Sequence, residues 1–218
     1  TQATGFAYEV VVVMDQKDWK GPAGEAIKSE LASSVPGLPQ AEPSLKITYV
    51  QPKDFTGLLR YVRNILVVTI DPTAYTKVSV GYENNVWARG QVVVSLKAPN
   101  TESIVEYSKT HEKALVNFFV KVEMNRAIEQ LQKEYSMVVM DNLKSDLNVM
   151  LNAPANFTYY KDTTDFFWSS NNANTGRMDL IVYTFPYTDP NTFTEEYLVA
   201  KRDSVLKANL PGSFPGSY

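Results

Sequence analysis

Residues 100–153 read NTESIVEYSKTHEKALVNFFVKVEMNRAIEQLQKEYSMVVMDNLKSDLNVMLNA and contain neither proline nor glycine. Their apolar side chains recur three or four positions apart, which is typical of one face of an amphipathic helix. A straight helix of this length would extend on the order of 70 Å, whereas a compact domain of this size has a radius of gyration of about 17 Å. We therefore expect a core helix with a bend or break within 134–140, and an extended rather than helical segment 148–151 ahead of Pro154.

The residues before this segment predict a parallel sheet. Apolar runs at 7–14 and 64–70 and an alternating segment at 45–50 predict strands, and expected helices at 22–32 and 52–61 separate them. Strands that alternate with helices form βαβ units, in which the strands pair in parallel. The first run, AYEVVVVM, is almost continuously apolar, as expected for a strand that is buried on both faces.

Two further pairs of segments alternate between apolar and polar residues and predict antiparallel hairpins. They are 77–82 with 91–98, and 165–169 with 178–185. Each hairpin precedes a helix, which suggests two similar hairpin–helix units at 77–150 and 160–210, although shared capping chemistry would produce the same likeness. The last helix is expected over 193–208, with Thr192 and Glu195 as a capping box.

These segments together predict a single α+β (mixed α/β) domain over residues 1–218. Its sheet would have parallel and antiparallel parts, and it would be packed by the long helix and two or three shorter helices.

Composition excludes several functions. The chain carries 21 Lys and Arg against 24 Asp and Glu, a net charge of −3, and its basic residues form no cluster that would bind nucleic acid. The absence of cysteine excludes thiolate catalysis, Cys-ligated metals and disulfides. No apolar run approaches the roughly 20 residues of a membrane span.

Three aspartates lie where predicted strands end. Asp15 follows the first strand, Asp71 follows the third, and Asp18 lies three residues after Asp15. If the two strands are parallel neighbours, these carboxylates meet at the edge where open α/β sheets bind ligands. Such oxygen ligands suit Mg²⁺ or Ca²⁺, so an alternative interpretation is a hydrolase or a metal- or ligand-binding domain. The same residues are also common in turns that follow strands.

An aromatic run suggests a glycan site. Phe166-Phe167-Trp168 and Tyr159-Tyr160 could form a platform for a sugar, and the polar loop after Trp168 contains Asn171 and Asn172 as further ligand-binding candidates. Alternating core and surface positions along a strand, followed by a turn-rich loop, would give the same pattern.

Catalytic motifs are missing from the sequence. His111 is the only histidine, and no second catalytic group can be assigned beside it. The sequence has no P-loop and no G-x-S-x-G elbow. We therefore assign no catalytic residue, no metal site and no cofactor, and we expect a non-enzymatic function.

Five blocks of the chain resemble a known family. They are VPGLPQAEP (35–43), RNILVV (63–68), FFVKVEMNR (118–126), DFFWSSNNANTGRM (165–178) and FTEEYLVAKRDSVLKANLPG (193–212). The family is the domain of unknown function 4837, found in uncharacterised lipoproteins of Gram-negative gut bacteria, and it has no established activity.

The resemblance implies a location in the cell envelope, either periplasmic or surface-exposed. It also implies a lipid-bearing cysteine upstream of Thr1, so that this chain is a piece of a longer lipoprotein and reaches the membrane only through that anchor. We accordingly expect non-enzymatic binding of a protein or glycan partner.

Overall fold

The chain forms two compact units, Thr1–Ala127 and Ile128–Tyr218. The computed structural model describes residues 1–214 and residue 217. We predicted one domain, whereas the contacts group into two units, and the division falls inside residues 100–153, where we predicted a long helix with a bend or break. None of the helices in the described part of the chain has both the length and the apolar character of a membrane span.

The first unit is built around a five-stranded sheet with the order β2-β1-β3-β5-β4. Its elements are β1 (Glu9–Val13), α1 (Gln16–Trp19), α2 (Pro22–Leu31), β2 (Lys46–Val50), the 3₁₀ turns η1 (Pro52–Asp54) and η2 (Gly57–Tyr61), β3 (Asn64–Ile70), β4 (Ser79–Asn84), β5 (Val92–Ala98), α3 (Thr101–Thr110) and α4 (Ala114–Lys133), the last of which continues past Ala127. β1 pairs in parallel with β2 and β3, β3 pairs in parallel with β5, and β4 is antiparallel to β5. The mixed sheet and the fold class predicted from the sequence are confirmed.

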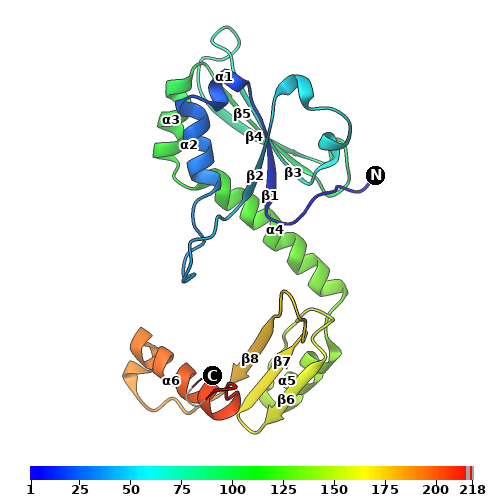
Figure 1. Ribbon diagram of the computed structural model, residues 1–218, viewed down its shortest axis with the longest axis vertical. Helices are drawn as coiled ribbons and strands as arrows, with labels where there is room; N and C mark the ends of the chain where they lie inside the picture. The colour runs from blue at the N-terminus through cyan, green and yellow to red at the C-terminus, as the bar shows by residue number, and fades with distance from the viewer. Residues whose placement is uncertain (215–216, 218) are drawn as a thin grey trace. The chain divides into compact units, whose positions relative to one another are not determined.

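The sheet of the first unit is covered on both faces. Successive side chains of a strand point to opposite faces, so Val10 and Val12 pack with α2, α3 and α4, whereas Val11 and Val13 pack with Phe55 beside the 3₁₀ turns. Figure 1 shows α2 and α3 on one side of the sheet and the η1–η2 segment, in cyan, on the other. This double burial explains why β1 is apolar without interruption.

The expected long helix is divided into α3, α4 and α5 (Met137–Leu147). The predicted break within 134–140 is confirmed, because Ser136 accepts a hydrogen bond from the Val139 amide and begins α5. An earlier break at 111–113 was not predicted: Lys113 adopts a left-handed conformation with φ of 62°, which ends the helical path after α3. Residues 148–151 are non-helical, as expected, but Asn148 is not extended: it ends α5 in a left-handed conformation with φ of 53°.

The second unit contains a three-stranded antiparallel sheet with the order β6-β7-β8. Its elements besides α5 are β6 (Tyr159–Thr163), β7 (Phe166–Ser170), β8 (Asp179–Tyr183), the 3₁₀ turn η3 (Pro190–Phe193) and α6 (Glu195–Asn209). β7 and β8 were predicted, whereas β6 was not. One face packs on α5 through a core that includes Val139, Leu143 and Phe167.

The last helix begins differently from its prediction. Thr194, rather than Thr192, caps α6, and its hydroxyl accepts a hydrogen bond from the Tyr197 amide. Thr192 is buried in η3 and donates its hydroxyl proton to the Asp189 carbonyl. The chain order of hairpin and helix occurs in both units, as β4–β5–α3 and as β7–β8–α6, and the proposed internal repeat stays a prediction.

Gly24 provides a test of the packing of α1 on α2. A Cβ added at Gly24 would lie 2.0 Å from the carbonyl oxygen of Trp19, and that backbone atom cannot rotate away. Although alanine favours helix over glycine by about 1 kcal/mol, we expect Gly24→Ala to reduce the free energy of unfolding by about 1–3 kcal/mol. Urea unfolding of the whole protein measures this.

Gly81→Ala is the matched control, because a Cβ at Gly81 in the exposed strand β4 meets nothing within 4 Å. Its free energy of unfolding should change by less than about 0.5 kcal/mol. Equal effects of the two substitutions would contradict the close approach at Trp19.

Candidate functional site

The first predicted site lies at the carboxyl edge of the five-stranded sheet. β1 and β3 are parallel neighbours, so Asp15 and Asp71 leave the sheet at the same edge, as expected. This pair is also where the strand order reverses, since β2 lies on one side of β1 and β3 on the other. Ligands of open α/β sheets bind at such a reversal.

The side chain of Asp71 is occupied by its own turn. Its Oδ1 accepts hydrogen bonds from the Thr73 amide at 2.8 Å, from the Thr73 hydroxyl at 2.7 Å and from the Ala74 amide at 3.2 Å. The Thr73 hydrogen bonds hold the pKa of Asp71 below its ordinary value. Asp18 lies within α1, and no group of three or more His, Asp or Glu among the described residues is placed to hold a metal ion.

An aromatic stack lies over the same region. The rings of Trp19 and Tyr49 stack with centroids 4.7 Å apart, Lys28 Nζ lies 4.4 Å from the Trp19 ring, and the Tyr49 hydroxyl donates to the Met14 carbonyl. Burial raises the pKa of Tyr49, and the carboxylates of Asp15 and Asp54 raise it further. The side chains of Trp19, Lys28 and Tyr49 therefore pack α1 and α2 against β2 at this edge of the sheet.

The β7 aromatic residues do not form one platform. Their side chains alternate between the two faces of the strand, so Phe167 lies in the core beside Tyr160, at 6.4 Å between ring centroids, while Trp168 faces the opposite side. Trp168 is half-buried, its indole N–H donates to Asp179 Oδ1 at 2.9 Å, and the Arg177 guanidinium lies 5.9 Å from its ring. The three neighbouring rings of β7 therefore do not share one face, and the ligand-binding role of Trp168 stays a prediction.

Asn171 and Asn172 shape the β7–β8 turn. Asn171 Oδ1 accepts from the amides of Ala173 and Met178, and its Nδ2 donates to the Gly176 carbonyl. Asn172 adopts a left-handed conformation with φ of 47°, which asparagine tolerates better than most residues. Both residues have a structural role in the turn.

A different aromatic cluster lies at the surface of the second unit, with two exposed rings, Tyr187 and Phe193, and two half-buried rings, Phe185 and Tyr197. We define the aromatic surface as Phe185, Tyr187, Phe193 and Tyr197. Phe185 and Tyr197 lie 6.1 Å apart between ring centroids, and Tyr187 and Phe193 lie 5.4 Å apart. Lys201 Nζ is 5.0 Å from the Phe185 ring and 5.7 Å from the Tyr197 ring, so a cation lies beside the first pair.

The sequence analysis missed this surface, although a signal was present. The run YTFPY (183–187) places aromatic rings at alternate positions, and Phe193 and Tyr197 are four residues apart across the start of α6. These spacings are also those of an ordinary strand and an ordinary helix, so they do not by themselves indicate a surface. Only the folded chain brings the two segments together.

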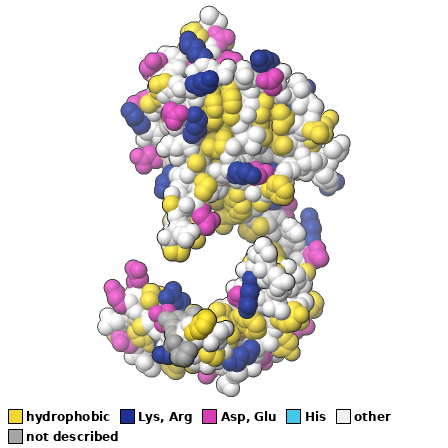
Figure 2. All heavy atoms as spheres, in the orientation of Figure 1, with side chains coloured by type: hydrophobic (Ala, Val, Ile, Leu, Met, Phe, Trp, Pro, Cys, Tyr) yellow, Lys and Arg dark blue, Asp and Glu magenta, His cyan; other side chains and the backbone are white. Residues whose placement is uncertain are grey.

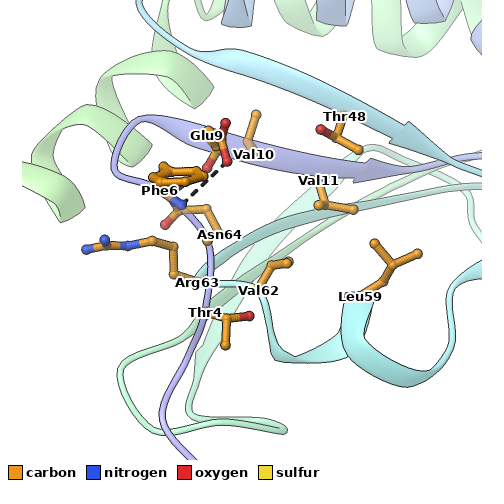
Figure 3. A pocket seen from close by; sticks show the side chains of 11 residues that line it. Thr4, Phe6, Glu9, Val10, Val11, Thr48, Leu59, Val62, Arg63 and Asn64 are labelled. Carbon is orange, nitrogen blue, oxygen red and sulfur yellow. Dashed lines mark hydrogen bonds between the residues drawn. The ribbon is translucent and has the colours of Figure 1, made fainter.

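A small cleft lies at the amino edge of the same five-stranded sheet. It has a volume of about 140 Å³. Figure 3 shows Val11, Leu59 and Val62 at its apolar end and Glu9 with Phe6 at the other. The Phe6 amide donates to Glu9 Oε2 at 3.4 Å, and the ion pair with Lys46 lowers the pKa of Glu9. The side chains of Glu9, Arg63 and Asn64 at this cleft are engaged within the protein.

A buried ionic cluster lies beside this cleft. Glu123 of α4 is 2% exposed, and its carboxylate bonds the guanidinium groups of Arg63 and Arg126 and the amide of Asn64. The side-chain amide of Asn64 also donates, through Nδ2, to the Glu9 carbonyl at 2.8 Å. The cluster therefore links α4 to the beginning of β1 and β3.

A second buried carboxyl group caps α4 at its start. Glu30 of α2 accepts a hydrogen bond from the Leu115 amide at 2.7 Å through Oε1. Its Oε2 and the Ser108 hydroxyl are buried without a hydrogen-bond partner among the described residues. Burial raises the pKa of Glu30, and the hydrogen bond from Leu115 opposes that shift without cancelling it.

Charges on the surface are mixed in sign. Figure 2 shows Lys, Arg, Asp and Glu side chains interspersed over the visible face, without a broad patch of either sign.

Two family models match the chain. Domain of unknown function (DUF8532) matches residues 3–132, and Domain of unknown function (DUF4837) matches residues 136–218. The resemblance to the second family is thereby confirmed, while the blocks at 35–43, 63–68 and 118–126 lie in the part that the first family matches. No curated protein and no solved structure matches the chain.

Loss of the Glu123 charge should be strongly destabilising. Glu123→Gln leaves Arg63 and Arg126 without their shared carboxylate, and breaking one partner out of a buried ion pair costs about 3–5 kcal/mol. Urea unfolding should report that loss, whereas Glu129→Gln, at an exposed position of α4, should have little effect. A loss below about 1 kcal/mol would contradict the structural role of the cluster.

Glu30 should make stability dependent on pH. The folded protein holds a proton on Glu30 to higher pH than the unfolded chain, whose glutamates have an ordinary pKa of 4.5. The folded state therefore binds more protons above about pH 4.5, and the contribution of Glu30 to stability falls as pH rises through its folded pKa. Glu30→Gln removes this pH-dependent contribution to stability and keeps an acceptor for the Leu115 amide.

As pH rises above about 4.5, the unfolding free energy of Glu30→Gln should increase relative to that of the wild type. Once pH exceeds the folded pKa of Glu30, the difference should stay constant. Glu25→Gln, on the exposed side of α2, is the control. A difference between Glu30→Gln and wild type that does not vary with pH would show that Glu30 keeps an ordinary pKa.

Proposed function

Because the chain belongs to the family of the Domain of unknown function (DUF8532) and continues with the Domain of unknown function (DUF4837), we propose that it is a non-enzymatic binding protein of the cell envelope, anchored by an upstream lipid, whose second unit binds a glycan. The envelope location is supported by the resemblance of residues 165–178 and 193–212 to envelope lipoproteins. The observation that carries the binding role is the pair Tyr187 and Phe193.

This pair leaves an unusual amount of aromatic area in water. Tyr187 is 65% exposed and Phe193 is 74% exposed, although the two rings touch. Leaving a large side chain exposed forgoes about 1.5–3 kcal/mol of burial free energy. Single exposed apolar residues are common, but neighbouring exposed rings are typical of interaction sites.

The chemistry of the aromatic surface favours a glycan. The negative face of an aromatic ring attracts the C–H groups of a sugar ring, and the hydroxyls of Tyr187 and Tyr197 can hydrogen-bond sugar hydroxyls. The segment between the rings is rich in short polar side chains, with Thr188, Asp189 and Asn191. Asp189 already accepts a hydrogen bond from the Asn191 amide, but a purely apolar partner that covered this segment would leave the Thr188 hydroxyl and the Asn191 side chain without hydrogen bonds.

A thermal-shift and calorimetric titration with envelope glycans tests this function. The probes are chitotetraose and soluble peptidoglycan strands. A bound glycan at a hundred times its Kd should stabilise the protein by about 2.7 kcal/mol. We expect this shift in the wild type and its loss in Tyr187→Ala and Phe193→Ala, because both rings lie on the exposed surface and their removal leaves the core intact.

Tyr159→Ala is the matched control, since Tyr159 is 56% exposed in the same unit but outside the aromatic surface. It should keep the shift. No shift with either glycan would contradict the proposal. Crosslinking of an envelope protein that depends on Tyr187 and Phe193 would assign the surface to a protein partner instead.

A further inference from the structure

A cavity of about 510 Å³ lies in the first unit between the loop 33–44 and the first turns of α4. Its volume is within the usual range of about 300–1,000 Å³ for small-molecule sites. The cavity is separate from the aromatic surface, which belongs to the second unit.

The loop that covers this cavity is closed on itself. Ser34 and Pro43 form an antiparallel bridge, the Val35 amide donates to the Glu42 carbonyl at 2.9 Å, and the Ser44 hydroxyl donates to the Ser33 carbonyl at 2.7 Å. Long loops without helix or strand are often functional when they are ordered. These contacts hold the wall of the cavity in place without a ligand.

Two residues with unusual backbone conformations line the cavity. Among the described residues, five non-glycine residues have positive φ, and three of them are asparagines. The other two, Tyr8 with φ of 59° and Lys113 with φ of 62°, both line this cavity. A left-handed conformation is costly for such side chains and tends to persist at functional sites.

The lining combines apolar walls with one charge of each sign. Val35 and Pro43 of the loop and Val116 and Val120 of α4 line the cavity, and the exposed lining residues Glu42 and Lys113 carry a carboxylate and an ammonium group. Neither of these two side chains forms an ion pair within the part of the chain that the structure describes. An occupant that satisfies both would carry opposite charges on an apolar body.

We propose that this cavity binds a small zwitterion with apolar side chains, of the class of short apolar peptides. The ligand carboxylate pairs with Lys113, its ammonium group pairs with Glu42, and its side chains pack between Val35 and Val116. The site needs no change of the backbone, because the loop is already closed.

Calorimetry with the full chain and three probes tests each part of the proposal. Leucyl-leucine carries both charges, N-acetyl-leucyl-leucine lacks the ammonium group, and leucyl-leucinamide lacks the carboxylate. Leucyl-leucine should bind, and each blocked probe should bind about tenfold more weakly, since a hydrogen bond to a charged group contributes that much or more.

The variants assign the two charges. Glu42→Gln should bind leucyl-leucine about tenfold more weakly but bind the acetylated probe as wild type does, and Lys113→Gln should show the converse pattern with the amidated probe. Asn117→Phe, at an exposed lining position of α4, should block all binding while leaving the melting temperature unchanged.

Lys109→Gln and Glu112→Gln are matched controls, because both residues lie beside a neighbouring cavity and outside this one. They should bind leucyl-leucine as the wild type does. Equal binding of the three probes, unchanged binding by Asn117→Phe, or no binding of leucyl-leucine would each overturn the proposal.

Discussion

The carboxylate of Glu123 is the interaction on which the first unit depends. A buried charge is tolerated only when it is paired and hydrogen-bonded, and Glu123 has Arg63, Arg126 and the Asn64 amide around it. Arg126 also donates to the carbonyls of Arg63 and Gly90, just before β3 and β5. Arg126 thus satisfies carbonyls just before β3 and β5, and Asn64, held by Glu123, satisfies the Glu9 carbonyl at the start of β1. These contacts fix the register of α4 on the sheet.

A second carboxyl group fixes the other end of the same helical segment. Glu30 reaches the Leu115 amide from α2, so the start of α4 is capped by tertiary structure and not by its own sequence. Between the two carboxyl groups, Val116 and Phe119 pack in the core. The two carboxyl groups differ in their pairing: Glu123 bonds two guanidinium groups and an amide, whereas Glu30 Oε2 has no hydrogen-bond partner among the described residues, and the pKa of Glu30 is raised.

Local patterns predicted most of the first unit. The β-branched runs and the helices between them specified β1, β2, β3 and their parallel pairing, since each signal lies within one element. The break before α4 was not predictable because its cap, Glu30, is 85 residues from Leu115. β6 was missed for a related reason: Tyr159–Thr163 is largely polar, and it becomes a strand only by pairing with β7.

The candidate sites show the same limit. Sequence placed Asp15 and Asp71 at the correct edge of the sheet, but it could not show that Thr73 and Ala74 occupy the Asp71 side chain. The aromatic residues of β7 were identified from sequence, but strand alternation divides them between two faces. Tyr187 and Phe193 were not identified, because their exposure depends on how the rest of the unit packs. A binding surface consists of side chains that the rest of the fold leaves exposed to solvent. Their exposure is set by tertiary packing, so it cannot be read from the local sequence around them.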